Sequence, residues 1–211
     1  MENIDELITR LAQAAPTAKP APHPFVLSFA GLAAAVLYLG VALLVSGARH
    51  DLPIKLHDIW FVAEIAALTG IFISTSLSAA LLSYPDLHQK RRIAFVPIVT
   101  FALFTLVMCY AWLADNPPAA LPVYSFECTL SITLFALLPM AGTFYVMRKF
   151  ASTHQRWAGS VALLFAFSVG ALWLRLYEQN DSIMHVIQWH YLPMIGFGLI
   201  GIWLGKWALK W

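Results

Sequence analysis

The sequence predicts an all-α membrane protein, a bundle of six transmembrane helices with both termini in the cytoplasm. Apolar and aromatic residues make up 60% of the chain and charged residues only 11%, whereas a soluble domain carries about 25% charge. The apolar residues gather in runs long enough to cross a bilayer, which takes about 20 residues per helix. The basic residues fall mainly in alternate connections between these runs, which is typical of a polytopic membrane protein.

Six apolar runs define the expected elements: 25–47, 59–83, 93–114, 124–147, 158–178 and 186–207. Each is expected to be a helix, because a backbone inside lipid must satisfy its own hydrogen bonds. The first run begins late and has five companions, which argues against a cleaved signal peptide. The connections are short, so we expect two parts, a cytoplasmic N-terminal segment over 1–24 and a transmembrane domain over 25–211.

The distribution of lysine and arginine predicts the orientation. Three of the thirteen basic residues, Arg49, Lys55 and Arg175, lie on one side of the predicted membrane, and the other ten lie in the two termini and in the second and fourth connections. The positive-inside rule places these ten in the cytoplasm. The net charge of +2 reflects this topology and gives no reason to expect nucleic-acid binding.

The N-terminal segment is expected to form a short amphipathic helix followed by a proline-rich spacer. Its apolar residues recur at helical spacing: Ile4, Leu7, Ile8 and Leu11. Such a helix either lies on the membrane surface or docks in a groove of a partner protein. Acidic residues on its polar face, Glu2, Asp5 and Glu6, suit an anionic lipid surface poorly, so a partner contact is at least as well supported.

The two cysteines of the chain, Cys109 and Cys128, lie on either side of the proline-rich connection between the third and fourth runs. At 1.5 Å per residue, Cys109 is expected about 9 Å below the outer end of its helix and Cys128 about 7 Å below the start of the next. The two thiols therefore share a depth near the periplasmic surface. Three interpretations stay open: packing residues, a redox- or metal-responsive pair and a permanent disulfide.

Ionisable residues gather in the same outer layer. Charged groups inside a membrane usually face the bundle interior with a partner, so Arg175 is expected to neutralise Glu64 or Glu127. His185 and His190 are about 140° apart on a regular helix, so both cannot face one ion, and each is better interpreted as an interfacial histidine than as a ligand. The whole layer comprises Glu64, Glu127, Arg175, Glu178, His185 and His190.

Catalytic arrangements are not favoured by the sequence. Ser160 lies at the cytoplasmic end of the fifth run, most of a bilayer away from His185 and His190, so a Ser–His pair as in rhomboid proteases fails on geometry. A thiol oxidoreductase usually needs more than one thiol pair, and a carrier favours charges at the membrane midplane. Glycines in the last two runs (Gly170, Gly196, Gly198 and Gly201) are better interpreted as sites of close helix packing. We therefore predict that the chain is not an enzyme.

Five motifs occur in order along the chain: "IDELITRLAQAAP", "GARHDLP", Cys128 with "ALLPM", "LRLYEQNDSIMHVIQWHYLP" and "LGKWALKW". Through these motifs the sequence resembles the NrsF-type anti-sigma factors, which are six-span inner-membrane negative regulators of an extracytoplasmic-function (ECF) sigma factor. The resemblance covers nearly the whole chain.

The resemblance implies a protein of the bacterial inner membrane that holds a sigma factor inactive at the cytoplasmic face and releases it under metal or oxidative stress. It makes the N-terminal helix the expected sigma-binding element. Cys128 is the better match to the sensing cysteines of the family, and Cys109 joins it as a candidate sensor or metal ligand. No resident cofactor is implied, and a transition-metal ion is a candidate for the signal. A membrane thiol oxidoreductase or a carrier of small molecules or metals is the alternative.

Overall fold

The structure of the protein, a computed structural model, describes residues 4–14, 21–114 and 125–210. Every regular element in these ranges is helical, and six stretches are long and apolar enough to cross a membrane. They are α2 (Pro24–Ser46), α4 (Ile59–Leu82), η2 with α5 (Ile93–Phe95 and Val96–Ala114), α6 (Phe126–Lys149), α7 (Gln155–Tyr177), and α8, η3 and α9 (Ile183–His185, Val186–Tyr191 and Leu192–Ala208). Each matches one predicted run to within three residues, so the six helices are confirmed.

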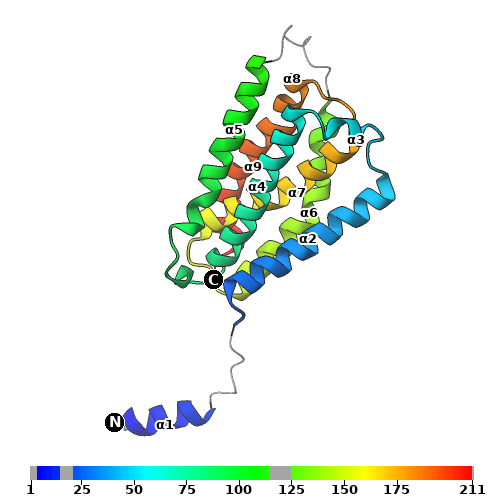
Figure 1. Cartoon of the computed structure of the whole chain (residues 1–211). Helices are drawn as coiled ribbons and strands as arrows, with labels where there is room; N and C mark the ends of the chain where they lie inside the picture. The colour runs from blue at the N-terminus through cyan, green and yellow to red at the C-terminus, as the bar shows by residue number, and fades with distance from the viewer. Residues whose placement is uncertain (1–3, 15–20, 115–124, 211) are drawn as a thin grey trace.

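Helix α7 lies in the middle of the bundle and is buried along nearly its whole length (Figure 1). It packs against α4, α6 and α9, while α2 and α5 lie further out and contact α4. The main core forms where these helices meet, and its largest fully buried side chains include Phe167 of α7 and Ile71 of α4. A single buried helix therefore organises the bundle, and the other spans surround it.

Glycines allow α7 and α9 to approach closely. A Cβ atom added at Gly159 would lie 2.2 Å from the carbonyl oxygen of Gly201, and one added at Gly205 would lie 2.7 Å from the Cα of Gly159. No side chain fits at such distances, so backbone packs directly on backbone. The predicted role in close packing is confirmed for Gly201, but at Gly196 an added Cβ would meet open space, and there the prediction was wrong.

The start of α2 and the end of α9 lie at the same end of the bundle (Figure 1). Side-chain hydrogen bonds join the chain segments at this end: the Tyr84 hydroxyl donates to the carbonyl oxygen of Pro22, and the Gln155 amide donates to that of Leu209 at 2.9 Å. The other end carries the short helix α3 (Leu52–Lys55) together with α8. The arrangement agrees with an even number of crossings, and the cytoplasmic location of the termini stays a prediction.

The N-terminal helix α1 (Ile4–Ala14) is present and presents an apolar face to solvent. The exposed fractions are 72% for Ile4, 45% for Leu7 and 58% for Ile8, and the side chain of Leu11 lies outside what the structure describes. On the polar face, Arg10 pairs with Glu6 at 3.0 Å, one turn earlier. An isolated helix of this length is only marginally stable in water. Burial of its apolar face against a partner or a membrane would stabilise α1.

Candidate metal centre

Four side chains with metal-binding atoms converge at the end of the bundle that carries α3 and α8. Cys128 lies in the first turn of α6, Glu178 follows the last residue of α7, His185 ends α8, and His190 lies in η3. One ligand atom from each residue can be chosen so that all four lie within 4.8 Å of one another. Both histidines are buried, whereas Cys128 and Glu178 are half-buried. We call these four residues the four-ligand cluster.

Glu178 is the central residue of the four-ligand cluster. Its Oε1 atom lies 3.1 Å from Nε2 of His185, and its Oε2 atom lies 3.1 Å from Nε2 of His190. The Cys128 Sγ atom is 3.4 Å from Glu178 Oε1 and 3.6 Å from His185 Nε2. Ligand atoms in a tetrahedral zinc site lie about 3.5 Å apart, so the four residues are close enough to close around one ion with small side-chain movements.

The two histidines meet because η3 is a π-helix. A π-helix forms i→i+5 hydrogen bonds, so residues five positions apart, such as His185 and His190, come to lie on the same side of the chain. Their ring centroids are 5.2 Å apart. The prediction that both could not face one ion was made for a regular α-helix, and it does not apply to this segment because Val186–Tyr191 is a π-helix.

The π-helix has a cause that is visible in the sequence. In an α-helix, the carbonyl of Trp189 would accept a hydrogen bond from the backbone N–H of residue 193, but residue 193 is a proline and has no N–H. The Thr129 hydroxyl of α6 donates to this carbonyl instead, at 2.6 Å. Pro193 therefore destabilises a regular α-helical turn at this point, and the Thr129 hydroxyl satisfies the Trp189 carbonyl, which Pro193 leaves without a backbone donor.

Unsatisfied nitrogen and oxygen atoms support a ligand at the four-ligand cluster. Within the cluster, the Nδ1 atoms of His185 and His190 are buried without a hydrogen-bond partner among the described residues, and Glu178 Oε2 and His190 Nε2 contact each other at 3.1 Å without forming a hydrogen bond. Buried polar atoms are normally satisfied, and each exception needs an explanation. Thiolate, imidazole and carboxylate are the ligands that zinc and copper take in proteins. The residues present therefore fit a transition-metal ion.

The Glu178 carboxyl is held in its ionised form. Burial favours the neutral acid and opposes this, but the neighbouring His190 and His185 outweigh the effect of burial, and the pKa of Glu178 lies below its usual value. A carboxylate must be ionised to bind a metal. Glu178 therefore enters the site in the protonation state that a cation requires.

A network of ion pairs lies beside the four-ligand cluster. Arg175 binds both oxygens of Glu64, at 2.7 and 2.8 Å, so of the two carboxylates considered from the sequence the structure selects Glu64. Arg49 binds Asp51 and Asp181 with two hydrogen bonds each. The Arg49 guanidinium lowers the pKa of Asp51 to about 2. The network fixes the segment after α7, which carries both Glu178 and Asp181.

Two of the predicted site residues lie away from the four-ligand cluster. Cys109 is an exposed free thiol on α5, and Cys128 is also free. Helix α5 packs mainly on α4 and α6 on α7, and the two helices lie on opposite sides of the bundle (Figure 1). Joint action of the two cysteines therefore stays a prediction that no contact supports. Glu127 is exposed, although it adjoins Cys128 in the sequence.

Comparison with known proteins shows which family the chain belongs to. A family model described as "NrsF: Negative regulator of sigma F" matches residues 11–211. The chain belongs to the NrsF family. A curated NrsF protein, the anti-sigma-F factor NrsF of Caulobacter vibrioides (strain NA1000 / CB15N), is 29% identical over 218 residues, which cover 98% of this chain and 99% of that protein. No solved structure matches the chain. The resemblance inferred from the sequence is thus confirmed, and NrsF proteins are regulators rather than catalysts.

The extent of the NrsF match is informative. The matched residues begin at Leu11 and so include the whole six-helix bundle and the four-ligand cluster, but only the last part of α1. The curated NrsF relative aligns over nearly the full chain. The bundle is therefore the part that the NrsF family model describes in full.

Proposed function

We propose that this NrsF-family protein holds an ECF sigma factor inactive at the cytoplasmic face of the bacterial inner membrane and releases it when a transition metal or an oxidant reaches the periplasmic side. Membership of a family of negative regulators of sigma F supports the regulatory role. The observation that carries the sensing role is the four-ligand cluster. The cluster lies at one end of the bundle. The start of α2, which connects to the tail that carries α1, lies at the opposite end.

A metal is favoured over an oxidant as the signal. Reversible thiol oxidation usually ends in a disulfide with a second, resolving cysteine, and Cys128 has histidine and carboxylate neighbours in place of a second thiol. The same reasoning weakens the alternative of a thiol oxidoreductase. A metal ion would bind Cys128, Glu178, His185 and His190. Glu178 would then contact the ion instead of the two histidine rings, and all four side chains would share one partner.

The ion-pair network supplies a route from the four-ligand cluster to α2. Glu178 and Asp181 lie on the same short segment after α7, and Asp181 is bound by Arg49 and by Lys55, the latter at 2.9 Å. Arg49 follows the end of α2 and also donates its backbone N–H to the carbonyl of Leu176 at 2.9 Å. A ligand that repositions Glu178 therefore acts on the outer end of α2, and the inner end of α2 leads to the tail.

The sigma-binding element is assigned to α1. Ile4, Leu7 and Ile8 form an exposed apolar face on this helix, and a helix of this kind docks through a few apolar anchors in a groove of its partner. Most of the binding energy of such an interface comes from few residues. Release of the sigma factor then requires only that this short helix leaves the groove.

The double variant Leu7→Ala/Leu11→Ala tests this assignment. It removes two anchors and is expected to raise transcription from sigma-dependent promoters in unstressed cells, with loss of sigma factor from the membrane fraction. Gln13→Ala, on the same helix, is the matched control and should leave repression intact. Full repression by a membrane-inserted double variant would show that α1 is not the sigma-binding element.

A further inference from the structure

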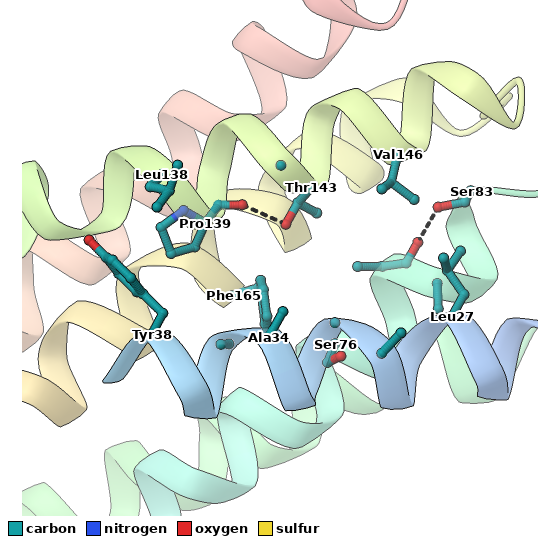
Figure 2. Close-up of a pocket in the computed structure, with 16 residues that line it drawn as sticks. Leu27, Ala34, Tyr38, Ser76, Ser83, Leu138, Pro139, Thr143, Val146 and Phe165 are labelled. Carbon is teal, nitrogen blue, oxygen red and sulfur yellow. Dashed lines mark hydrogen bonds between the residues drawn. The ribbon is translucent and has the colours of Figure 1, made fainter. Parts of the chain in front are cut away.

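A second site lies in the half of the bundle that contains the start of α2. A cavity of about 450 Å³ opens between α2, α4 and α6, within the range of small-molecule sites, which is roughly 300–1,000 Å³. Figure 2 shows Ala34 of α2 and Pro139 of α6 on facing walls, with Phe165 of α7 between them. We call this cavity the α2–α6 groove.

The α2–α6 groove opens to the side of the bundle. Its floor is the buried ring of Phe165, which is 6% exposed, whereas Leu138 at its rim is 64% exposed. Its walls on α2 and α6 carry small residues, including Ala30, Ala34 and Gly142, which leave room between the helices. Because these helices are expected to cross the membrane, the opening faces the hydrocarbon layer and not water.

The α2–α6 groove offers no free hydroxyl donor to an occupant among its described residues. Four hydroxyl groups line it, and each donates to a backbone carbonyl: Tyr38 to Phe135 at 3.2 Å, Ser76 to Ser28 at 3.2 Å, Ser83 to Ala79 at 2.9 Å and Thr143 to Pro139 at 2.8 Å. Figure 2 draws the last two bonds. Acceptor groups of an occupant would stay unsatisfied there at a cost, so the lining favours a plain alkyl chain.

The α2–α6 groove suits a thin chain better than a helix. It lies between neighbouring helices, with α2 and α6 forming facing walls. A helix with its side chains is about 10 Å across. A single extended acyl chain, by contrast, is thin enough to lie between two helices.

Exposed lysines border the inner end of the α2–α6 groove. Val146 lines the groove, and Lys149 follows it by three residues, on the same face of α6. At the start of α2, the Lys90 amine lies 4.3 Å above the ring of Phe25, so it lies at the level of the inner end of the groove, although Phe25 and the lining residue Leu27 are on different faces of α2. Two positive charges therefore stand where the headgroup of a lipid in the inner leaflet would be, and lysines near the membrane surface attract anionic lipids.

We propose that the α2–α6 groove binds one acyl chain of an anionic phospholipid, whose headgroup contacts Lys90 and Lys149. The proposal goes beyond the regulatory function and rests only on the insertion of the bundle in a membrane. The bound chain fills the space between α2 and α6, so it holds α2 in place relative to the rest of the bundle. Because α2 leads to the tail, lipid composition becomes a second input to the same regulator.

Photo-crosslinking in nanodiscs tests the proposal. The full-length protein is reconstituted with phosphatidylglycerol that carries a diazirine on one acyl chain, and adducts are mapped by mass spectrometry. We expect adducts to concentrate on residues of the α2–α6 groove relative to the lipid-facing side of α9. The phosphatidylcholine analogue should give weaker labelling of the groove, and Lys149→Gln should remove the difference between the two lipids.

A pair of glycine variants provides the decisive comparison. An added Cβ meets open space at Gly142 in the groove and equally at Gly196 on α9. Gly142→Leu fills the groove and should reduce groove labelling by about tenfold, the effect of losing burial for about two methylene groups, whereas Gly196→Leu should not reduce it. Even labelling of all spans, or unchanged labelling in Gly142→Leu, would overturn the site while showing insertion. A crosslink between two protein copies at the groove would also overturn it, and absence of label from every span would refute insertion itself.

Discussion

The guanidinium of Arg175 on α7 binds both carboxylate oxygens of Glu64 on α4, at 2.7 and 2.8 Å, with both residues buried. Such a bidentate pair fixes both distance and orientation. It joins the central helix to its neighbour close to the four-ligand cluster, because Arg175 lies three residues before Glu178. The pair therefore sets the position of the segment from which the cluster is built.

Removal of one partner from this pair should be strongly destabilising. Glu64→Gln leaves the Arg175 charge buried, and breaking a buried pair in this way costs about 3–5 kcal/mol. The variant should unfold at a lower temperature in detergent, as measured by the loss of helical circular dichroism. Glu127→Gln, which changes an exposed carboxylate, is the control. Equal melting temperatures for the two variants would show that the pair contributes little.

The four-ligand cluster predicts a clear difference between the two cysteines. Cys128→Ser and His190→Ala should each weaken binding of Zn²⁺ or Cu²⁺ to the purified protein by more than the roughly 10–100-fold that loss of an outer-shell partner costs. Cys109→Ser should leave the affinity unchanged, because Cys109 is exposed on another helix. Isothermal titration calorimetry in detergent measures these affinities. A similar loss in Cys109→Ser would restore the hypothesis that the two thiols act together.

The contact between α7 and α9 predicts a sharp response to one methyl group. Gly201→Ala would place its Cβ 2.6 Å from the carbonyl oxygen of Gly159, and such overpacking costs about 1–3 kcal/mol. Gly196→Ala adds the same methyl group to open space and should be neutral or slightly stabilising. Thermal unfolding of the two variants in one detergent checks the difference. If Gly201→Ala is as stable as Gly196→Ala, the helices are not in backbone contact.

The predicted topology can be tested with reporter fusions. Ten of the thirteen basic residues lie on the side of the termini, so this side should be cytoplasmic. A fusion after Lys210 should be active only with a cytoplasmic reporter, such as β-galactosidase. A fusion within 115–123 should be active only with a periplasmic reporter, such as alkaline phosphatase. A periplasmic C-terminus would invert the proposed direction of signalling.

The fold was predictable because composition alone decides it. Runs of about 20 apolar residues have few alternatives to a transmembrane helix, and the helices end close to the polar residues that bound each run. The pairing of Arg175 with either Glu64 or Glu127 was also predictable, since a buried charge needs a partner. Which of the two carboxylates reaches Arg175 depends on how each helix is rotated about its axis. A helix that is apolar on all sides carries no sequence pattern from which this rotation can be predicted.

The composition of the candidate site was harder to predict. The residues Cys128, Glu178, His185 and His190 were all identified, but Cys128 was grouped with Cys109 on the basis of depth. Depth along the membrane is readable from the sequence, whereas the order of helices around the bundle is not. The convergence of the two histidines depends on the π-helix, for which Pro193 and Thr129 together were the available signal.

The burial of α7 has a consequence for biosynthesis. In the predicted membrane topology, helices are inserted in the order of translation, so α7 would enter the membrane before its partner α9. Until α9 follows, the surface around Gly159 that is shaped for backbone contact would lack its complement. A chain interrupted before Leu192 would therefore contain the whole of α7 but leave it without the helix that packs on its glycines.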